Sequence, residues 1–478
     1  MKSLTSKYFD LDEFKKLLIV FITFFVLSLA AVWIGDLKFG LKLALFAFFI
    51  FATLNAADRS KWVFLLYLPS IPLSSALILF TPFFKRLSGF FVEVPNVYAI
   101  YNSLARPDGI YIYTILEAIL LFFLTYQIAT KQSLRYKSVL LFILFFVISS
   151  FFSIFSTLNV TRTFFQNIHL LFSLVMFYFS LQLWDDQKYE NLVIFVLIIL
   201  ILLTVVDVIS LKAIKMLLAG KWIIREVGRF NTPNPPAHLA GMGVIFSLYL
   251  AFKRRFPSNI LYFGFTGILL VVILCTGSRN GLISTIIASF LFLFFATKSR
   301  EKYNWILVTI TGFVFLVVFY KLGRLVFQLR LNPQLLLYDA SILSRFLLWK
   351  NSLRYFIAHP FSPVGTGNFF YFYGSLGLPF AHNFLINLLI ESGLVPFLMA
   401  LWAYFLGIKK IVGKIVEFFK FSEVRKEELV AVAFILYMMM LFSADQFLYD
   451  GSLWRFMLVF LSFSISKLWR EKGEKIAS

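Results

Sequence analysis

Long apolar runs recur from one end of this 478-residue chain to the other, and they restrict its possible folds more than any other feature. Many of them approach or exceed about 18 residues, the length of a helix that crosses the hydrocarbon core of a bilayer. Hydrophobic residues make up 60% of the chain and aromatic residues 19%, which no soluble domain normally reaches. The sequence therefore predicts an all-α integral membrane protein that forms a single polytopic domain over residues 1–478.

The apolar runs define fourteen candidate spans, and about 12–14 transmembrane helices are expected because several runs are short. They lie near residues 17–35, 39–56, 62–84, 110–129, 138–156, 166–184, 191–210, 236–252, 259–276, 281–297, 305–320, 382–408, 429–444 and 453–468. Twelve helices with re-entrant pieces are the alternative. The first run follows four lysines and no small-residue cleavage site follows it, so we expect a retained helix rather than a signal peptide.

Lysine and arginine are unevenly distributed between alternate loops. Cytoplasmic loops retain these residues, and a cytoplasmic N-terminus places 26 of the 45 on the cytoplasmic side. The clusters at 253–255, 298–302 and 409–426 all lie on that side. This parity predicts that both termini are cytoplasmic. The longest polar interruption, 321–381, is then a large loop on the outer side.

The outer side nevertheless carries a strong local positive charge. Its segments 211–236, 276–280 and 321–381 contain twelve Lys or Arg residues and only two acidic residues, a net charge of +10. Lys and Arg are normally enriched in cytoplasmic loops, so a positive charge on the outer side is unusual. We therefore expect an anionic partner there, such as phosphate or pyrophosphate. Contact with lipid headgroups is the alternative.

Two short turns on the outer side each place an arginine just before a span. Arg229 opens the sequence Arg-Phe-Asn-Thr-Pro-Asn-Pro-Pro at 229–236, where prolines stop one helix and can start the next. The free backbone amides at such a start favour an anion. Arg279 lies in Thr-Gly-Ser-Arg-Asn-Gly at 276–281, and its guanidinium can donate two parallel hydrogen bonds to a phosphate. A headgroup contact or a purely topological role is the alternative for each arginine.

The outer loop 321–381 has two recognisable parts. From 344 to 359, basic residues such as Arg345 alternate with apolar residues at helical spacing. This pattern predicts an amphipathic helix that lies on the outer leaflet or caps a cavity. The stretch 360–377 is rich in proline and glycine, so it is expected to form turns and can bring backbone close to a ligand.

His382 and Asn383 follow this loop and open the span predicted at 382–408. A neutral histidine near pH 7 can accept a proton from an attacking hydroxyl, which makes His382 the candidate catalytic base. Asn387 and Glu391 are four residues apart and share one helix face, whereas His382 and Glu391 are nine apart and point to opposite sides. An interfacial histidine and a structural pairing of Glu391 with another helix are the alternatives.

The remaining ionisable residues and the cysteine content limit other kinds of site. The single cysteine, Cys275, excludes an intrachain disulfide and a cysteine-based metal cluster. Four histidines stand at 169, 238, 359 and 382. None has metal-ligand spacing, so neither a metal nor a cofactor is expected. Glu117 and Asp207 lie in or near spans and are expected to pair with other helices.

Taken in order, these motifs resemble the O-antigen ligase family of bacterial envelope proteins over roughly residues 225–400. The resemblance rests on the turns at 229–234 and 276–281, the Arg…Trp…Pro…Gly-Thr-Gly loop at 345–367 and the His-Asn…Gly helix start at 382–393. His382, Asn383 and Gly393 fit the family pattern. Pro396 departs from it, because a small residue often stands at that place.

The resemblance implies a metal-independent, inverting glycosyltransferase of lipopolysaccharide biosynthesis, in the bacterial inner membrane with its active site on the periplasmic side. The donor would be a glycan on undecaprenyl pyrophosphate and the acceptor a hydroxyl of lipid A–core. Arg229 and Arg279 would bind the donor pyrophosphate, and His382 would sit at the acceptor hydroxyl. Further candidates for a supporting role are Arg345, Asn383, Asn387 and Glu391.

The family also contains polymerases of O-antigen or exopolysaccharide, which use the same class of donor and are the main alternative. Protein O-oligosaccharyltransferases form a third group in the family. A transporter of lipid-linked glycans is the alternative outside it, although transporters tend to place polar residues near the midplane on broken helices. Membrane lipids are expected partners, and nucleic acids are not.

Overall fold

A computed structural model describes most of the chain from residue 136 onward. The described residues are 136–184, 187–205, 208–209, 233–253, 258–298, 340–369, 381–421, 424–444 and 451–469, with short pieces at 64, 67–68, 78–79, 110–111 and 116–121. The predicted spans at 17–35, 39–56 and 305–320 lie outside these residues, as do Asp207 and Arg229.

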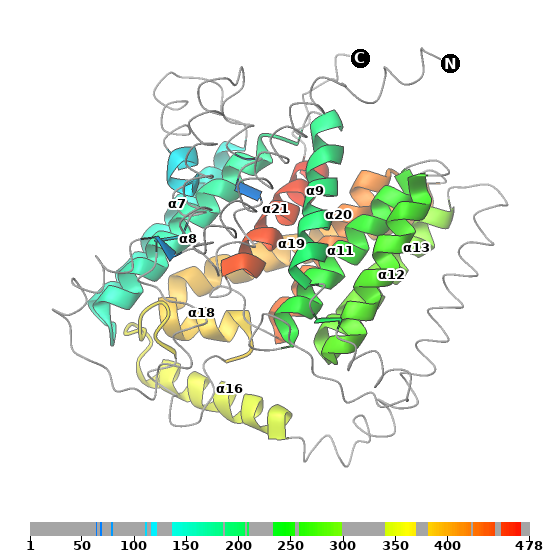
Figure 1. The fold of residues 1–478 in the computed structure, drawn as a ribbon. Helices are drawn as coiled ribbons and strands as arrows, with labels where there is room; N and C mark the ends of the chain where they lie inside the picture. The colour runs from blue at the N-terminus through cyan, green and yellow to red at the C-terminus, as the bar shows by residue number, and fades with distance from the viewer. Residues whose placement is uncertain are drawn as a thin grey trace, which may run out of the picture.

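The described part is a group of packed helices (Figure 1). In chain order they are α7 (Lys137–Phe151), the 3₁₀ helix η2 (Phe152–Phe155), α8 (Val160–Leu181), α9 (Gln187–Val205), α11 (Asn234–Lys253), α12 (Ser258–Thr276), α13 (Arg279–Lys298), α16 (Ala340–Ala358), α18 (Phe384–Ser392), α19 (Leu394–Lys420), α20 (Lys426–Ala444) and α21 (Gly451–Leu468). Helices α8, α11, α12, α13, α20 and α21 fall close to spans predicted from the sequence.

Six helical segments in the described part are long and apolar enough to cross a membrane. They are Lys137–Phe155, Val160–Leu181, Asn234–Lys253, Asn259–Thr276, Arg279–Ala296 and Leu394–Lys420. The prediction of an all-α integral membrane protein is confirmed, and the chain is a multi-pass membrane protein.

The span predicted at 382–408 is wrong, because the structure divides it into two helices. Helix α18 ends at Ser392, and α19 then extends from Leu394 to Lys420. Gly393 between them adopts φ 92°, a backbone conformation that side chains with a Cβ disfavour. Pro396 lies in the first turn of α19, where a helix needs no backbone N–H donor, so it is compatible with this new start.

A short strand pair corrects part of two further predictions, although residues 64, 67–68 and 116–121 of the same predicted spans are helical. Strand β1 (Ile78–Leu79) pairs antiparallel with β2 (Ile110–Tyr111), although both fall in segments predicted as spans, 62–84 and 110–129. β-Branched and aromatic residues such as isoleucine and tyrosine favour strands as well as apolar helices, so the apolar pattern alone did not separate the two.

Helix α11 is the central helix of the group, and its side chains from Pro236 to Phe252 are buried on all sides. A Cβ at Gly241 would overlap the side chains of Thr285 on α13 and Tyr437 on α20. The glycine therefore lets three helices meet closely. The Tyr437 hydroxyl completes this contact by donating a 2.8 Å hydrogen bond to the His238 carbonyl.

The contacts of α11 also fix the directions of its neighbours. Near its start, Gly281 of α13 lies against Ala237, and near its end the rings of Phe252 and Phe292 are 5.8 Å apart. Helices α11 and α13 are therefore parallel. The Lys426 ammonium at the start of α20 donates to the Phe252 carbonyl, so α20 runs antiparallel to both. The starts of α11 and α13 and the end of α20 therefore lie at one end of the helix group.

Buried ion pairs connect helices that are distant in sequence. Glu117 accepts hydrogen bonds from Arg455 of α21 at 2.7 and 2.9 Å, which confirms the expected pairing of this carboxylate with another helix. Glu190 of α9 pairs with Lys253 of α11 at 3.2 Å and with Lys467 of α21 at 2.6 Å. Each charge is compensated inside the helix group, as buried charges require.

Candidate active site

The first part of the candidate site lies where α11 and α13 begin. The Ser278 hydroxyl donates a 2.9 Å hydrogen bond to the Asn234 side-chain carbonyl, which joins the turn at 276–281 to the start of α11. The same hydroxyl accepts from the Gly281 amide at 3.3 Å. Arg279, half-buried, is the first residue of α13, so it stands at the positive end of that helix. This end of the group is suited to an anion.

The second part lies at the start of α18. The Asn383 side chain caps this helix by accepting from the Ile386 amide at 3.0 Å, and its Nδ2 donates to the Ser443 carbonyl at 3.1 Å. The rings of Phe384 and Phe442 stack with centroids 4.7 Å apart. The start of α18 is therefore fixed to the end of α20.

His382 precedes this cap in an uncommon backbone conformation. It is half-buried and has φ 50°, in the left-handed region that residues other than glycine rarely adopt. Such a conformation costs about 1–3 kcal/mol and persists where the surrounding contacts enforce it, which occurs often at active sites. The contacts of Ala381 and Asn383 on either side of His382 supply that enforcement.

Helix α20 brings the two parts to one end of the molecule. Tyr437 of α20 meets Thr285 of α13 beside a glycine of α11. Along α20, Ser443, which binds α18, lies six residues after Tyr437, a distance of about 9 Å along the helix axis. Along α13, Arg279 lies six residues before Thr285, again about 9 Å along the axis. Because α13 and α20 are antiparallel, both displacements point the same way. Arg279 and His382 thus lie at the same end.

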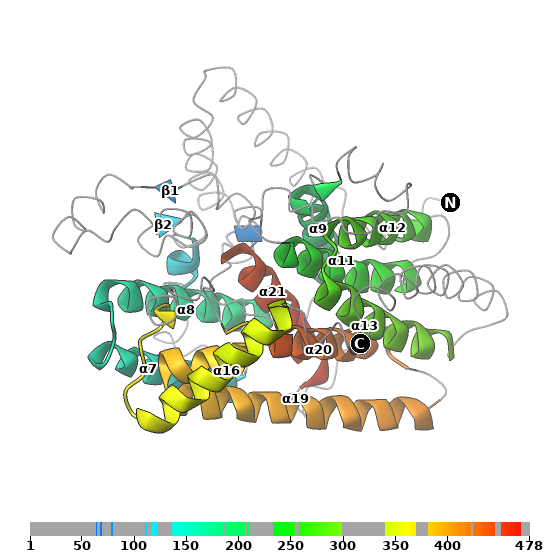
Figure 2. The same ribbon diagram turned by 90° about the horizontal axis from the view of Figure 1, so that it is seen from below.

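Helix α16 adds Arg345 to this end. The predicted amphipathic helix at 344–359 is confirmed as part of α16, which lies below α18 at the lower edge of the helix group in Figure 1 and is seen in front in Figure 2. The Trp349 indole donates a 2.6 Å hydrogen bond to the Ala381 carbonyl, next to His382. Arg345 stands one turn before Trp349, so it shares a helix face with it.

The glycine-rich stretch after α16 contacts protein, not open space. Gly365 has φ 94°, and a Cβ there would overlap the Thr157 side chain. The Phe369 amide donates a 2.9 Å hydrogen bond to Glu391, and the Asn387 side-chain carbonyl accepts from the Ala381 amide at 3.3 Å. Asn387 and Glu391, two of the candidates for a supporting role, are therefore buried where α18 contacts the neighbouring segments.

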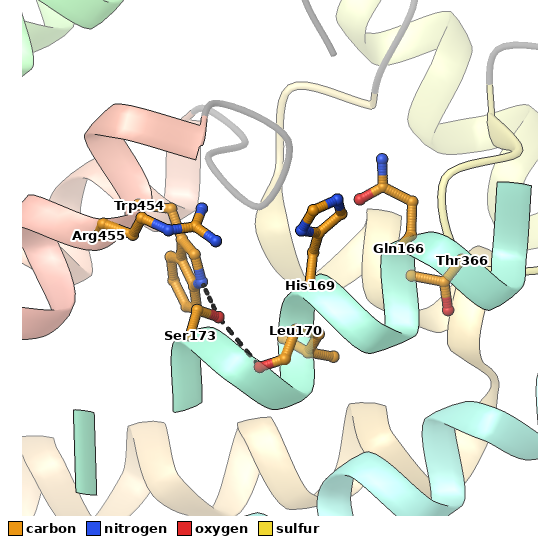
Figure 3. Close-up of a pocket in the computed structure, with 7 residues that line it drawn as sticks. All are labelled: Gln166, His169, Leu170, Ser173, Thr366, Trp454 and Arg455. Atoms are coloured by element: carbon orange, nitrogen blue, oxygen red, sulfur yellow. Dashed lines mark hydrogen bonds between the residues drawn. The ribbon is translucent and has the colours of Figure 1, made fainter. Parts of the chain in front are cut away.

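A small polar cavity lies between α8 and α21, and the sequence did not predict it. Its volume is about 20 Å³, which suits one water molecule. It is lined by Gln166, His169, Leu170, Ser173, Thr366, Trp454 and Arg455 (Figure 3). The only available signal was the presence of polar side chains within apolar segments, which commonly marks inward-facing positions. Neither Arg279 nor His382 lines this cavity.

Part of the candidate site falls within a segment that matches a known family, whereas Arg229 and the start of α11 lie outside it. Residues 264–401 match the family described as O-antigen ligase, and this segment includes Arg279, Arg345 and His382. The description indicates a glycosyltransferase-like enzyme of the ligase or polymerase type. No curated protein matches the chain. The family match supports the resemblance seen in the motifs at 276–281, 345–367 and 382–393, and it shows that residues 264–401 are similar to the O-antigen ligase family.

Proposed function

We propose that the protein transfers a glycan from an undecaprenyl-pyrophosphate donor to a hydroxyl of lipid A–core at the periplasmic face of the bacterial inner membrane. One observation carries the proposal: Arg279 begins α13 and His382 immediately precedes the cap of α18, at the same end of the helix group and inside the segment that matches O-antigen ligases. A cation for the leaving group and a base for the acceptor are the two functions that this transfer needs.

The arginines would stabilise the departing pyrophosphate. As the bond from the anomeric carbon to the pyrophosphate oxygen breaks, negative charge develops on that oxygen. Arg279 at the start of α13 can donate hydrogen bonds to it, and the partial positive charge of the helix end adds to the attraction. We assign the same role to Arg229, which precedes the start of α11.

His382 would act on the acceptor. The acceptor oxygen forms the new bond to the anomeric carbon while its proton passes to the imidazole. Attack from the side opposite the pyrophosphate inverts the configuration at that carbon. The chemistry assigned here needs only side chains of this chain, so we propose a metal-independent reaction. In the same proposal both termini are cytoplasmic and 321–381 is a periplasmic loop of one polytopic domain.

The acceptor decides between a ligase and a polymerase. We expect purified protein, given an undecaprenyl-pyrophosphate-linked glycan and lipid A–core, to form a product whose mass is that of lipid A–core plus the glycan, less one water. Mass spectrometry of the lipid fraction measures this product. The exposed Arg425→Ala variant, changed at the other end of α20, should form it at the wild-type rate.

Two other outcomes would redirect the proposal. A longer glycan that remains on undecaprenyl pyrophosphate, with lipid A–core unmodified, would identify a polymerase. Folded protein that forms neither product, but moves the donor across a vesicle bilayer, would contradict the transferase assignment and identify a transporter.

A further inference from the structure

We propose that Glu391 is a positioning residue: it fastens the loop 364–369 and α8 to α18, and through Asn387 it holds His382 in its left-handed conformation. The inference rests on the proposed role of His382 as the base. Glu391 lies in the last turn of α18, whereas His382 precedes the first turn, so Glu391 acts on the imidazole through other residues.

The Glu391 side chain lies at a junction of three elements. It is 1% exposed, and its carboxyl accepts the 2.9 Å hydrogen bond from the Phe369 amide. The Gly367 amide also donates to this carboxyl, and Arg162 of α8 is the charged group that faces it. A buried carboxyl is stable only where such partners are held in place. Glu391 thus organises backbone donors from the loop around the end of α18.

The loop itself is bound to α8 and α18 by further hydrogen bonds. Asn368 Nδ2 donates to the hydroxyl of Thr157, which precedes α8, at 2.6 Å and to the hydroxyl of Thr163, in the first turn of α8, at 2.7 Å. The Val364 amide donates to the Ile390 carbonyl of α18 at 2.9 Å. With Glu391, these contacts connect the start of α8 to the last turn of α18.

Asn387 provides the route from Glu391 to the histidine. The two side chains are four residues apart on one face of α18, where the Asn387 amide is an electrostatic neighbour of the carboxyl, although its buried Nδ2 forms no hydrogen bond with a described residue. At its other side, Asn387 Oδ1 accepts from the Ala381 amide at 3.3 Å. Ala381 immediately precedes His382, whose φ is 50°. A change at Glu391 can therefore reach the backbone of the base within two contacts.

The proposal is tested by kinetics of Glu391→Ala and Glu391→Gln. We expect Glu391→Ala to lower kcat for transfer by about 10–100-fold, since a displacement of about 1 Å at a reacting group has an effect of this size. The KM for the donor should stay within about twofold, because Arg279 is untouched. Glu391→Gln retains an acceptor for the Phe369 amide and should keep kcat within about threefold.

The route through Asn387 is tested by a double-mutant cycle. Asn387→Ala should lower kcat as Glu391→Ala does, and the double variant should be no slower than the slower single variant, because the two residues act in one chain of contacts. Fully additive losses, or a folded Glu391→Ala variant with kcat within threefold of the wild type, would overturn the proposal. If Glu391→Ala does not fold, kcat of Asn387→Ala is compared with kcat of Glu391→Gln. A loss in Asn387→Ala alone supports the proposal, and equal kcat values would overturn it.

A readout independent of transfer separates this inference from the proposed function. Mass spectrometry can measure the rate at which diethyl pyrocarbonate modifies His382, with exposed His359 as an internal control. The rate at His382 should change severalfold in Glu391→Ala and stay unchanged in Glu391→Gln. An unchanged rate in Glu391→Ala rejects the positioning role, whereas an inactive wild-type enzyme rejects only the proposed transfer.

The same variants should differ in pH dependence. Helix α18 has nine residues and is too short to span a membrane, and burial raises the pKa of the Glu391 carboxyl to about 8 despite the Phe369 amide. A raised pKa means that the folded protein holds this proton more tightly than the unfolded chain, so stability falls as pH rises toward 8. The unfolding midpoint of the wild type should therefore fall relative to Glu391→Gln between pH 6 and pH 8; parallel curves would contradict this.

Discussion

His382→Ala is expected to lower kcat of glycan transfer by about 10²–10⁴-fold, the usual contribution of a positioned acid–base group. The acceptor hydroxyl is a weak nucleophile, and the variant removes the imidazole that we propose as the acceptor of its proton. Donor affinity should change little, because the arginines proposed to bind the pyrophosphate remain. The measurement is single-turnover transfer from the lipid-linked donor to lipid A–core, with donor binding determined separately.

His359→Ala is the matched control for this variant. His359 follows the end of α16, is exposed, and packs its ring 4.9 Å from the ring of Tyr355. The His359→Ala variant removes one imidazole from the segment that precedes α18 without altering the start of α18, so transfer should proceed at the wild-type rate. If His382→Ala transferred glycan as fast as His359→Ala, the catalytic assignment would be wrong.

Arg279→Ala is expected to lower kcat/KM for the donor by about 10²–10³-fold, comparable with the loss of one donor to a developing oxyanion. Arg279→Lys should recover part of this loss, since lysine restores the charge but not the two parallel hydrogen bonds of a guanidinium. Steady-state kinetics with varied donor, together with binding of undecaprenyl pyrophosphate, measure both effects.

Arg425→Ala serves as the control for loss of positive charge. The Arg425 side chain is 72% exposed beside the start of α20, at the end of the helix group opposite Arg279. The two variants change the net charge equally, so a general electrostatic effect would weaken the donor interaction in both. Equal donor affinity in Arg279→Ala and wild type would exclude a pyrophosphate-binding role for this arginine.

The sequence predicted the membrane helices well where length and composition determine them. Helices α11, α12 and α13 occupy the predicted segments within a few residues, because each is an apolar run bounded by polar or proline-containing turns. The charge pattern also anticipated that Lys253 and Lys426 lie at one end of the group. In contrast, the break at Gly393 falls inside an uninterrupted apolar run, where hydropathy gives no boundary.

The sequence predicted single residues of the candidate site better than it predicted the contacts between them. Helical spacing predicted that His382 and Glu391 point to opposite sides, but His382 lies before the start of α18 with φ 50°, so that spacing does not apply to it. Helical spacing also could not reveal that the Phe369 amide binds this carboxyl, since that contact joins segments distant in the chain. Likewise, the glycines at 365 and 367 were expected to approach a ligand, whereas their backbone approaches the side chains of α8. These contacts depend on tertiary packing, which local sequence patterns do not reveal.

The most direct test of the account asks whether Arg279 and His382 share the periplasmic side. In a Cys275→Ser background, which removes the single native thiol, Arg279→Cys and His382→Cys should each react with a membrane-impermeant maleimide in intact spheroplasts. Arg425→Cys should react only after the membrane is permeabilised. Labelling of position 279 or 382 that requires permeabilisation would contradict the common outer site on which the proposed transfer depends.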